Sequence, residues 1–106
     1  MNNTIRLNIE KSTLQNNNYR KIIYTDAKMQ LVLMSVVNDI PEEKHSGTQF
    51  IRIEKGRGVA HIGGMRFNLK DGVSVIIPPN TLHYIKNTGD DDLKLYSIYT
   101  PPEHTH

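Results

Sequence analysis

The chain has 106 residues, a length that fits one domain with a single hydrophobic core. It carries 13 Lys and Arg against 11 Asp and Glu, so its formal net charge is only +2. So small an excess, spread over the chain, argues against nucleic acid as a partner. The chain has no cysteine, which excludes disulfides and thiolate chemistry.

The first residues, MNNTIRLNIEKSTLQ, contain no apolar run of the kind that a signal peptide needs. No apolar run elsewhere approaches the ~20 residues of a membrane-spanning helix. We therefore expect a cytoplasmic protein without a membrane partner.

Residues 1–18 are predicted to form an N-terminal arm. A short helical turn is expected over 11–15 with Ser12 as its cap, and the Asn run at 16–18 ends it. Before that turn, Ile5, Leu7 and Ile9 alternate with polar residues, as in a strand. We expect this strand to add to the sheet edge of a second copy, which predicts a homodimer.

Strand-like segments rich in β-branched and aromatic residues follow, with a turn about every ten residues. We expect strands over 19–25, 29–37, 49–55, 59–62, 65–69, 72–78, 81–87 and 93–99. Gly63 and Gly64 are typical of a hairpin turn, and no segment keeps a helical period. Eight or nine short strands predict an all-β sandwich or barrel, a single domain over 1–106. The tail, residues 102–106, is expected to contribute little, with His104 and His106 disordered.

Two segments contain residues at recognisable spacings. In the first, Glu43 stands two residues before His45, and Gln49 follows four residues after it. The second comprises Gly72, Pro78, Asn80, His83 and Asn87. Side chains two apart on a strand share a face, so Glu43 and His45 can converge if their segment is extended. Gln49 is likewise expected to share a face with the apolar residues of its strand.

These spacings resemble the two conserved motifs of the cupin superfamily, G-x5-H-x-H-x3,4-E-x6-G and G-x5-P-x-G-x2-H-x3-N. The second motif departs only at Asn80, which replaces a glycine and tolerates the same left-handed turn. In the first motif, Glu43 replaces the first histidine and Gln49 replaces the glutamate. The flanking segments also resemble small single-domain cupins, so the resemblance covers nearly the whole chain.

The resemblance implies a small jelly-roll cupin β-barrel with a divalent transition metal ion near its mouth. Its ligands would be Glu43, His45, Gln49 and His83, a mixture of imidazole and oxygen donors that suits zinc, iron, manganese or nickel without distinguishing them. The other interpretations are that Glu43 faces solvent beside Glu42 and that Gln49 only forms hydrogen bonds inside the barrel. His61, between Ala60 and Ile62, is expected to face outward.

The function we expect is metal-dependent action on, or binding of, a small molecule such as a sugar or a carbonyl compound. As an enzyme it would be an isomerase similar to the mannose-6-phosphate isomerase type of cupin, or an oxygenase, with Glu43 as a catalytic base if it does not ligate. The alternatives are a small-ligand binding or sensory cupin without turnover, and a barrel whose metal site is degenerate.

Overall fold

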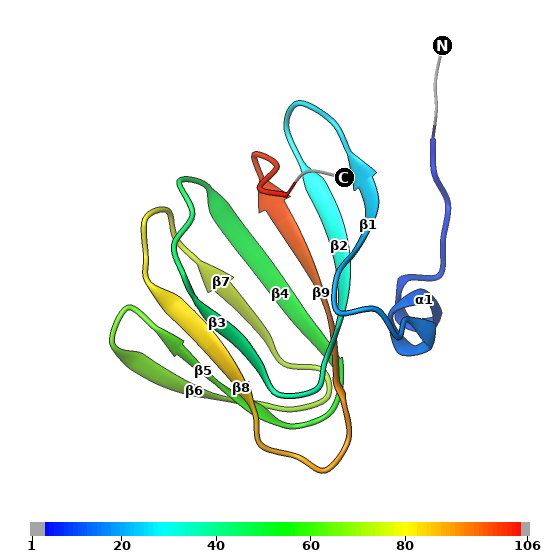
Figure 1. The fold of residues 1–106 in the computed structure, drawn as a ribbon. Helices are drawn as coiled ribbons and strands as arrows, with labels where there is room; N and C mark the ends of the chain where they lie inside the picture. Colours follow the sequence, from blue (N-terminus) through cyan, green and yellow to red (C-terminus); the bar gives the residue numbers. More distant parts are fainter. Residues whose placement is uncertain (1–3, 105–106) are drawn as a thin grey trace.

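A computed structural model of the chain describes residues 4–104 (Figure 1). One short helix, α1 (Ile9–Gln15), precedes all the strands. The strands are β1 (Lys21–Thr25), β2 (Gln30–Val36), β3 (Asp39–Glu43), β4 (Thr48–Lys55), β5 (Gly58–Ile62), β6 (Met65–Leu69), β7 (Ser74–Ile77), β8 (His83–Asn87) and β9 (Leu93–Thr100).

The strands form two antiparallel sheets that face each other (Figure 1). One sheet has the order β1-β2-β9-β4-β7, and the other has the order β3-β8-β5-β6. Neighbours in each sheet are mostly distant in sequence, as in a jelly roll. This arrangement confirms the all-β, cupin-type barrel.

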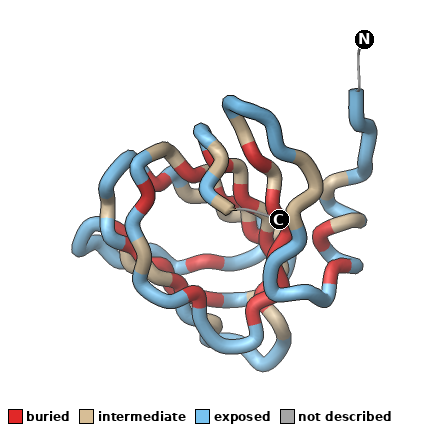
Figure 2. Tube along the Cα trace, turned by 45° about the horizontal axis from the view of Figure 1, so that its top comes forward, coloured by how far each residue is buried: buried red, intermediate tan, exposed pale blue. Residues whose placement is uncertain are grey.

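The buried residues, red in Figure 2, form a core between the sheets, and in β4 and β9 buried and less buried residues alternate. In β4 the inward residues are Gln49, Ile51 and Ile53, which share one face as the alternation predicts. In β9 they include Leu95 and Tyr99. β4 and β9 thus carry aliphatic residues deep in the barrel and the polar groups of Gln49 and Tyr99 near one end.

Two turns have the backbone conformation that their residues predict. Gly63 and Gly64, with φ of 55° and 82°, join β5 to β6 in a tight hairpin. Asn80 has a φ of 57°, the left-handed conformation expected where the cupin motif has glycine.

The N-terminal arm differs from the prediction. The helix begins at Ile9 rather than at residue 11, and its cap is Asn8, whose Oδ1 accepts a hydrogen bond from the Lys11 amide, not Ser12. The segment with Ile5 and Leu7 carries no strand within this chain, so the predicted alternation stops at Asn8. α1 contacts β9, β4 and β2, which places it on the five-stranded sheet.

Strand β3 was not predicted. Its sequence, DIPEE, contains a proline and three acidic residues, all of which disfavour strands. The structure tolerates Pro41 because β3 is an edge strand, where a missing backbone N–H costs little.

The described part of the tail is ordered, which differs from the expected disorder of His104. Glu103 and His104 are held by hydrogen bonds to Gln30, and His104 packs against Tyr99. No local pattern predicts this contact, because 73 residues separate Gln30 from Glu103. His106 lies outside the described residues. Among residues 4–104, no helix is long and apolar enough to cross a membrane.

Candidate metal centre

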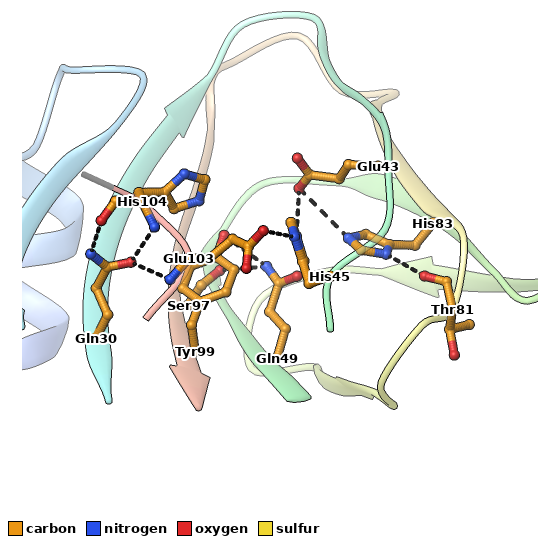
Figure 3. Close-up of polar contacts among 10 residues, drawn as sticks. All are labelled: Gln30, Glu43, His45, Gln49, Thr81, His83, Ser97, Tyr99, Glu103 and His104. Atoms are coloured by element: carbon orange, nitrogen blue, oxygen red, sulfur yellow. Dashed lines mark hydrogen bonds and ion pairs between the residues drawn. The ribbon is translucent and has the colours of Figure 1, made fainter. Parts of the chain in front are cut away.

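Glu43, His45 and His83 converge at one end of the barrel (Figure 3). One ligand atom from each residue lies within 4.8 Å of the others. Oε1 of Glu43 is 3.2 Å from Nε2 of His45 and 3.6 Å from Nε2 of His83 (Figure 3). The three residues come from the end of β3, the β3–β4 loop and the start of β8.

Glu43 reaches the cluster through an irregular strand pairing. In the β3–β8 ladder Ile40 pairs with Ile85 and Glu43 pairs with His83, with a register shift between them. Such a shift bends an edge strand and redirects its side chains. Glu43 is therefore half-buried beside His83, while its neighbour Glu42 is exposed.

His45 is fixed by the second motif's turn. Its carbonyl oxygen accepts a hydrogen bond of 2.7 Å from the backbone N–H of Asn80. The imidazole is buried, with Nε2 toward Glu43 and Nδ1 2.9 Å from Oε1 of Glu103. The contact with Glu103 is an ion pair by distance rather than an aligned hydrogen bond.

His83 has a defined tautomer. Its Nδ1 lies 2.8 Å from the carbonyl oxygen of Thr81, which can only accept, so Nδ1 carries the proton. The lone pair of Nε2 then faces Glu43 and His45. This Nε2 is buried and has no hydrogen-bond partner among the described residues.

Gln49 lies beside the cluster and is tied to β9. Its Nε2 donates to Oγ of Ser97 (3.2 Å) and to the hydroxyl of Tyr99 (3.1 Å). Its Oε1, the atom that would ligate a metal, is buried and has no hydrogen-bond partner among residues 4–104. Hydrogen bonds inside the barrel therefore explain the position of Nε2 of Gln49 but leave its Oε1 without a partner.

The cluster shifts the pKa values of its members. Burial disfavours ionisation of Glu43 and is the largest influence, but His83 and His45 together outweigh it and lower the pKa of Glu43 below its ordinary value. For His83, burial again acts most strongly and opposes the charged form. The contacts with Glu43 and with the Thr81 carbonyl outweigh it, so the pKa of His83 is raised.

These groups fit a divalent metal ion. Two imidazole nitrogens and a carboxylate oxygen converge, and the buried Nε2 of His83 and Oε1 of Gln49 lack partners that a cation would supply. Glu103 brings a second carboxylate to the same group. The resulting excess of negative charge favours a cation over a neutral guest.

Three residues at this end of the barrel were not singled out from the sequence as site residues. Glu103 contacts His45, and Gln30 holds Glu103 and His104; both contacts are tertiary and leave no local pattern in the sequence. Tyr99 is a buried residue of the barrel core, and its hydroxyl also holds Gln49. Its even spacing from Leu95 on β9 was the available signal.

His61 lies outside the cluster, as expected. It is on the outer face of its sheet, where its ring stacks on Tyr84 with centroids 4.4 Å apart. It therefore offers a histidine of similar chemistry away from the site.

Comparison with known proteins supports the same family. The Cupin_2 family model, described as cupin domain, matches residues 31–99. The uncharacterized protein YrkC of Bacillus subtilis strain 168 is 40% identical, with 92% of this chain and 58% of that protein covered. The uncharacterized protein L612 of Acanthamoeba polyphaga mimivirus is 42% identical, with 92% and 66% covered. The chain thus spans about 58–66% of the length of these relatives.

Solved structures match as well. The crystal structure of BH2720 from Bacillus halodurans superposes with a TM-score of 0.93 at 39% identity, covering 96% of this chain and 84% of that one. The structure of KdgF from Halomonas sp. gives a TM-score of 0.71 at 18% identity, covering 79% and 78%. The second likeness concerns the fold alone.

Proposed function

The chain belongs to the cupin domain family, and from that premise we propose that it binds a divalent transition metal ion and presents it to a small molecule. The ligands in this proposal are Glu43, His45 and His83, with Gln49 as a fourth. The observation that carries it is the convergence of three ligand atoms within 4.8 Å at the barrel end. The unpartnered buried atoms of His83 and Gln49 support it.

A metal ion held by three or four protein ligands keeps open positions for water or substrate and acts there as a Lewis acid. The residues of this chain would do the rest. The Thr81 carbonyl holds the His83 tautomer, and Ser97 and Tyr99 hold the amide of Gln49. Together they fix ligands whose orientation would otherwise cost entropy on binding.

We favour ligation over base catalysis for Glu43. One of its oxygens lies between the two imidazoles, where a metal ligand belongs, and the lowered pKa keeps it ionised at neutral pH. To act as a base, Glu43 would have to move away from His45 and His83 toward the substrate. The same convergence argues against the degenerate-site alternative.

The small molecule we propose is a sugar or a carbonyl compound, because a Lewis acid polarises such oxygens. The reactions that we propose are isomerisation or oxygen chemistry, and binding without turnover is the alternative. We exclude nucleic acid from the proposal because the net charge is only +2. A cytoplasmic location stays a prediction.

The test is metal content and Co²⁺ titration of untagged protein. We expect one equivalent in the wild type and a loss of at least about 100-fold in affinity in His45→Ala and His83→Ala, since each removes a ligand. His61→Ala is the matched control and should bind as the wild type does. Full binding by His83→Ala would show that the site lies elsewhere. Turnover of a panel of sugars and carbonyl compounds by the loaded protein then separates enzyme from binder.

A further inference from the structure

The last described residues, Pro101 to His104, lie at the same end of the barrel as the metal cluster (Figure 3). We propose that this segment, the C-terminal strap, uses Glu103 to position His45 for metal binding. The inference rests on the metal-binding function proposed above. It reverses the expectation that the tail is dispensable.

The strap is held by one buried amide at the start of β2. Oε1 of Gln30 accepts hydrogen bonds from the backbone N–H groups of Glu103 (3.2 Å) and His104 (2.9 Å). Its Nε2 donates to the carbonyl oxygen of His104 (2.6 Å). Gln30 is fully buried, and leaving its amide unpaired there would destabilise the fold. The strap and Gln30 therefore stabilise each other.

Two further contacts fix the strap at either end. Gly47, in the loop that carries His45, packs so closely that a Cβ there would lie 2.6 Å from Cδ of Pro101. At the far end, the His104 ring meets Tyr99 edge-on, with centroids 4.9 Å apart. The His45 loop thus packs against the start of the strap, which keeps Glu103 close to His45.

Glu103 lies next to Nδ1 of His45 as the Thr81 carbonyl lies next to Nδ1 of His83, although only the Thr81 contact is aligned as a hydrogen bond. A metal-ligating histidine usually gives its other ring N–H to a carboxylate or carbonyl, which fixes the ring and raises its basicity. His83 has the Thr81 carbonyl at 2.8 Å from Nδ1, and His45 has Glu103 at 2.9 Å from Nδ1. In both rings this leaves Nε2 directed at Glu43. Glu103 is therefore a positioning residue, and it adds negative charge beside the cation.

The first measurement is Co²⁺ affinity of the full chain by titration. We expect Glu103→Ala to weaken binding about 10–100-fold. Glu103→Gln keeps an oxygen acceptor and should recover part of the loss. Glu42→Ala makes the same charge change at an exposed neighbour of the cluster and should bind within about twofold of wild type. The metal-free melting temperature of Glu103→Ala should change little, which separates positioning from a purely structural role.

The second measurement is amide hydrogen exchange of Glu103 and His104 in the metal-free protein. Both amides should be protected in the wild type and exposed in Gln30→Met, which removes the amide but keeps the volume. That variant should also bind Co²⁺ more weakly. If Gln30→Met loses the exchange protection of these two amides but binds Co²⁺ as tightly as the wild type, the proposal is contradicted.

The outcomes separate the two proposals. If the wild type binds Co²⁺ and Glu103→Ala binds it equally well, the strap inference is overturned and the proposed function stands. If the wild type binds no Co²⁺, the proposed function fails and the inference fails with it.

Discussion

Glu43 and His83 share one contact and shift each other's pKa in opposite directions. The pKa of Glu43 is lowered from 4.5, so this carboxylate stays ionised above pH 5 and adds no pH dependence there. The pKa of His83 is raised above 6.5. Since imidazole binds metal only when deprotonated, a proton on His83 competes with the cation below that raised value.

We therefore predict that Co²⁺ affinity begins to fall while the pH is still above 6.5. Below the raised pKa of His83, it should fall by about tenfold per pH unit for each proton displaced. Co²⁺ titrations between pH 5.5 and 8.5 measure this. His61→Ala is the control, and its affinity should depend on pH as that of the wild type does. An affinity that stays constant down to pH 6 would contradict the prediction.

Gln49 stands where the cupin motif has glutamate, which predicts that affinity can be raised. Gln49→Glu adds a negative ligand in place of the neutral Oε1, and the hydroxyls of Ser97 and Tyr99 can rotate to donate to it. We expect Co²⁺ binding about 10-fold tighter, because ligand charge is a main determinant of cation affinity. Gln15→Glu, on the exposed end of α1, controls for net charge. Unchanged or weaker binding in Gln49→Glu would argue that residue 49 does not ligate.

At the scale of elements, the turn before β8 connects the two motifs. Asn80 takes the left-handed conformation and donates its backbone N–H to the carbonyl of His45. Asn80→Ala should lose about 1–2 kcal/mol in unfolding free energy, since a Cβ disfavours this conformation without the help of a short polar side chain. Asn80→Gly should be nearly neutral. Urea unfolding of both variants measures the difference, and equal loss in both would point to the side chain instead of the backbone.

The same scale shows which elements a single sequence can predict. Residues 49–55 and 93–99 alternate cleanly, and the structure has strands there with Gln49 and Tyr99 facing inward. Strand β3 could not be predicted because Pro41 and its acidic neighbours disfavour strands locally, and only the pairing with β8 makes it one. Edge strands depend on tertiary contacts in this way.

At the scale of the molecule, the motif spacing predicted which residues gather and the fold explains how. Glu43, His45 and His83 meet because β3 and β8 are neighbours in one sheet. The resemblance to the cupin motifs predicted this meeting because it implied the barrel as well as the ligands. Glu103 belongs to no motif. Its place depends on Gln30, whose burial follows from the packing of β2 against β9 and the strap. Contacts of this range are decided by the whole barrel and leave no local pattern.

The arm that precedes α1 leads to the last prediction, a homodimer. Ile5 and Leu7 remain 51% and 36% exposed, and β7, an edge strand of the larger sheet, exposes 65% of Ile76. In a dimer, the apolar segment of each copy can pair with the unpaired edge strand of the other copy and so extend its sheet. Burying two such side chains in each copy would favour association by several kcal/mol.

We expect the wild type to sediment as a dimer at micromolar concentration and the double variant Ile5→Asp, Leu7→Asp to sediment as a folded monomer. Val37→Asp changes an apolar residue that is more exposed, at 65%, and does not belong to the arm, and it should leave the dimer intact. A monomeric wild type would refute the dimer. A dimer that survives the double variant would move the interface away from the arm, to a face whose apolar side chains the same series of aspartate substitutions can locate.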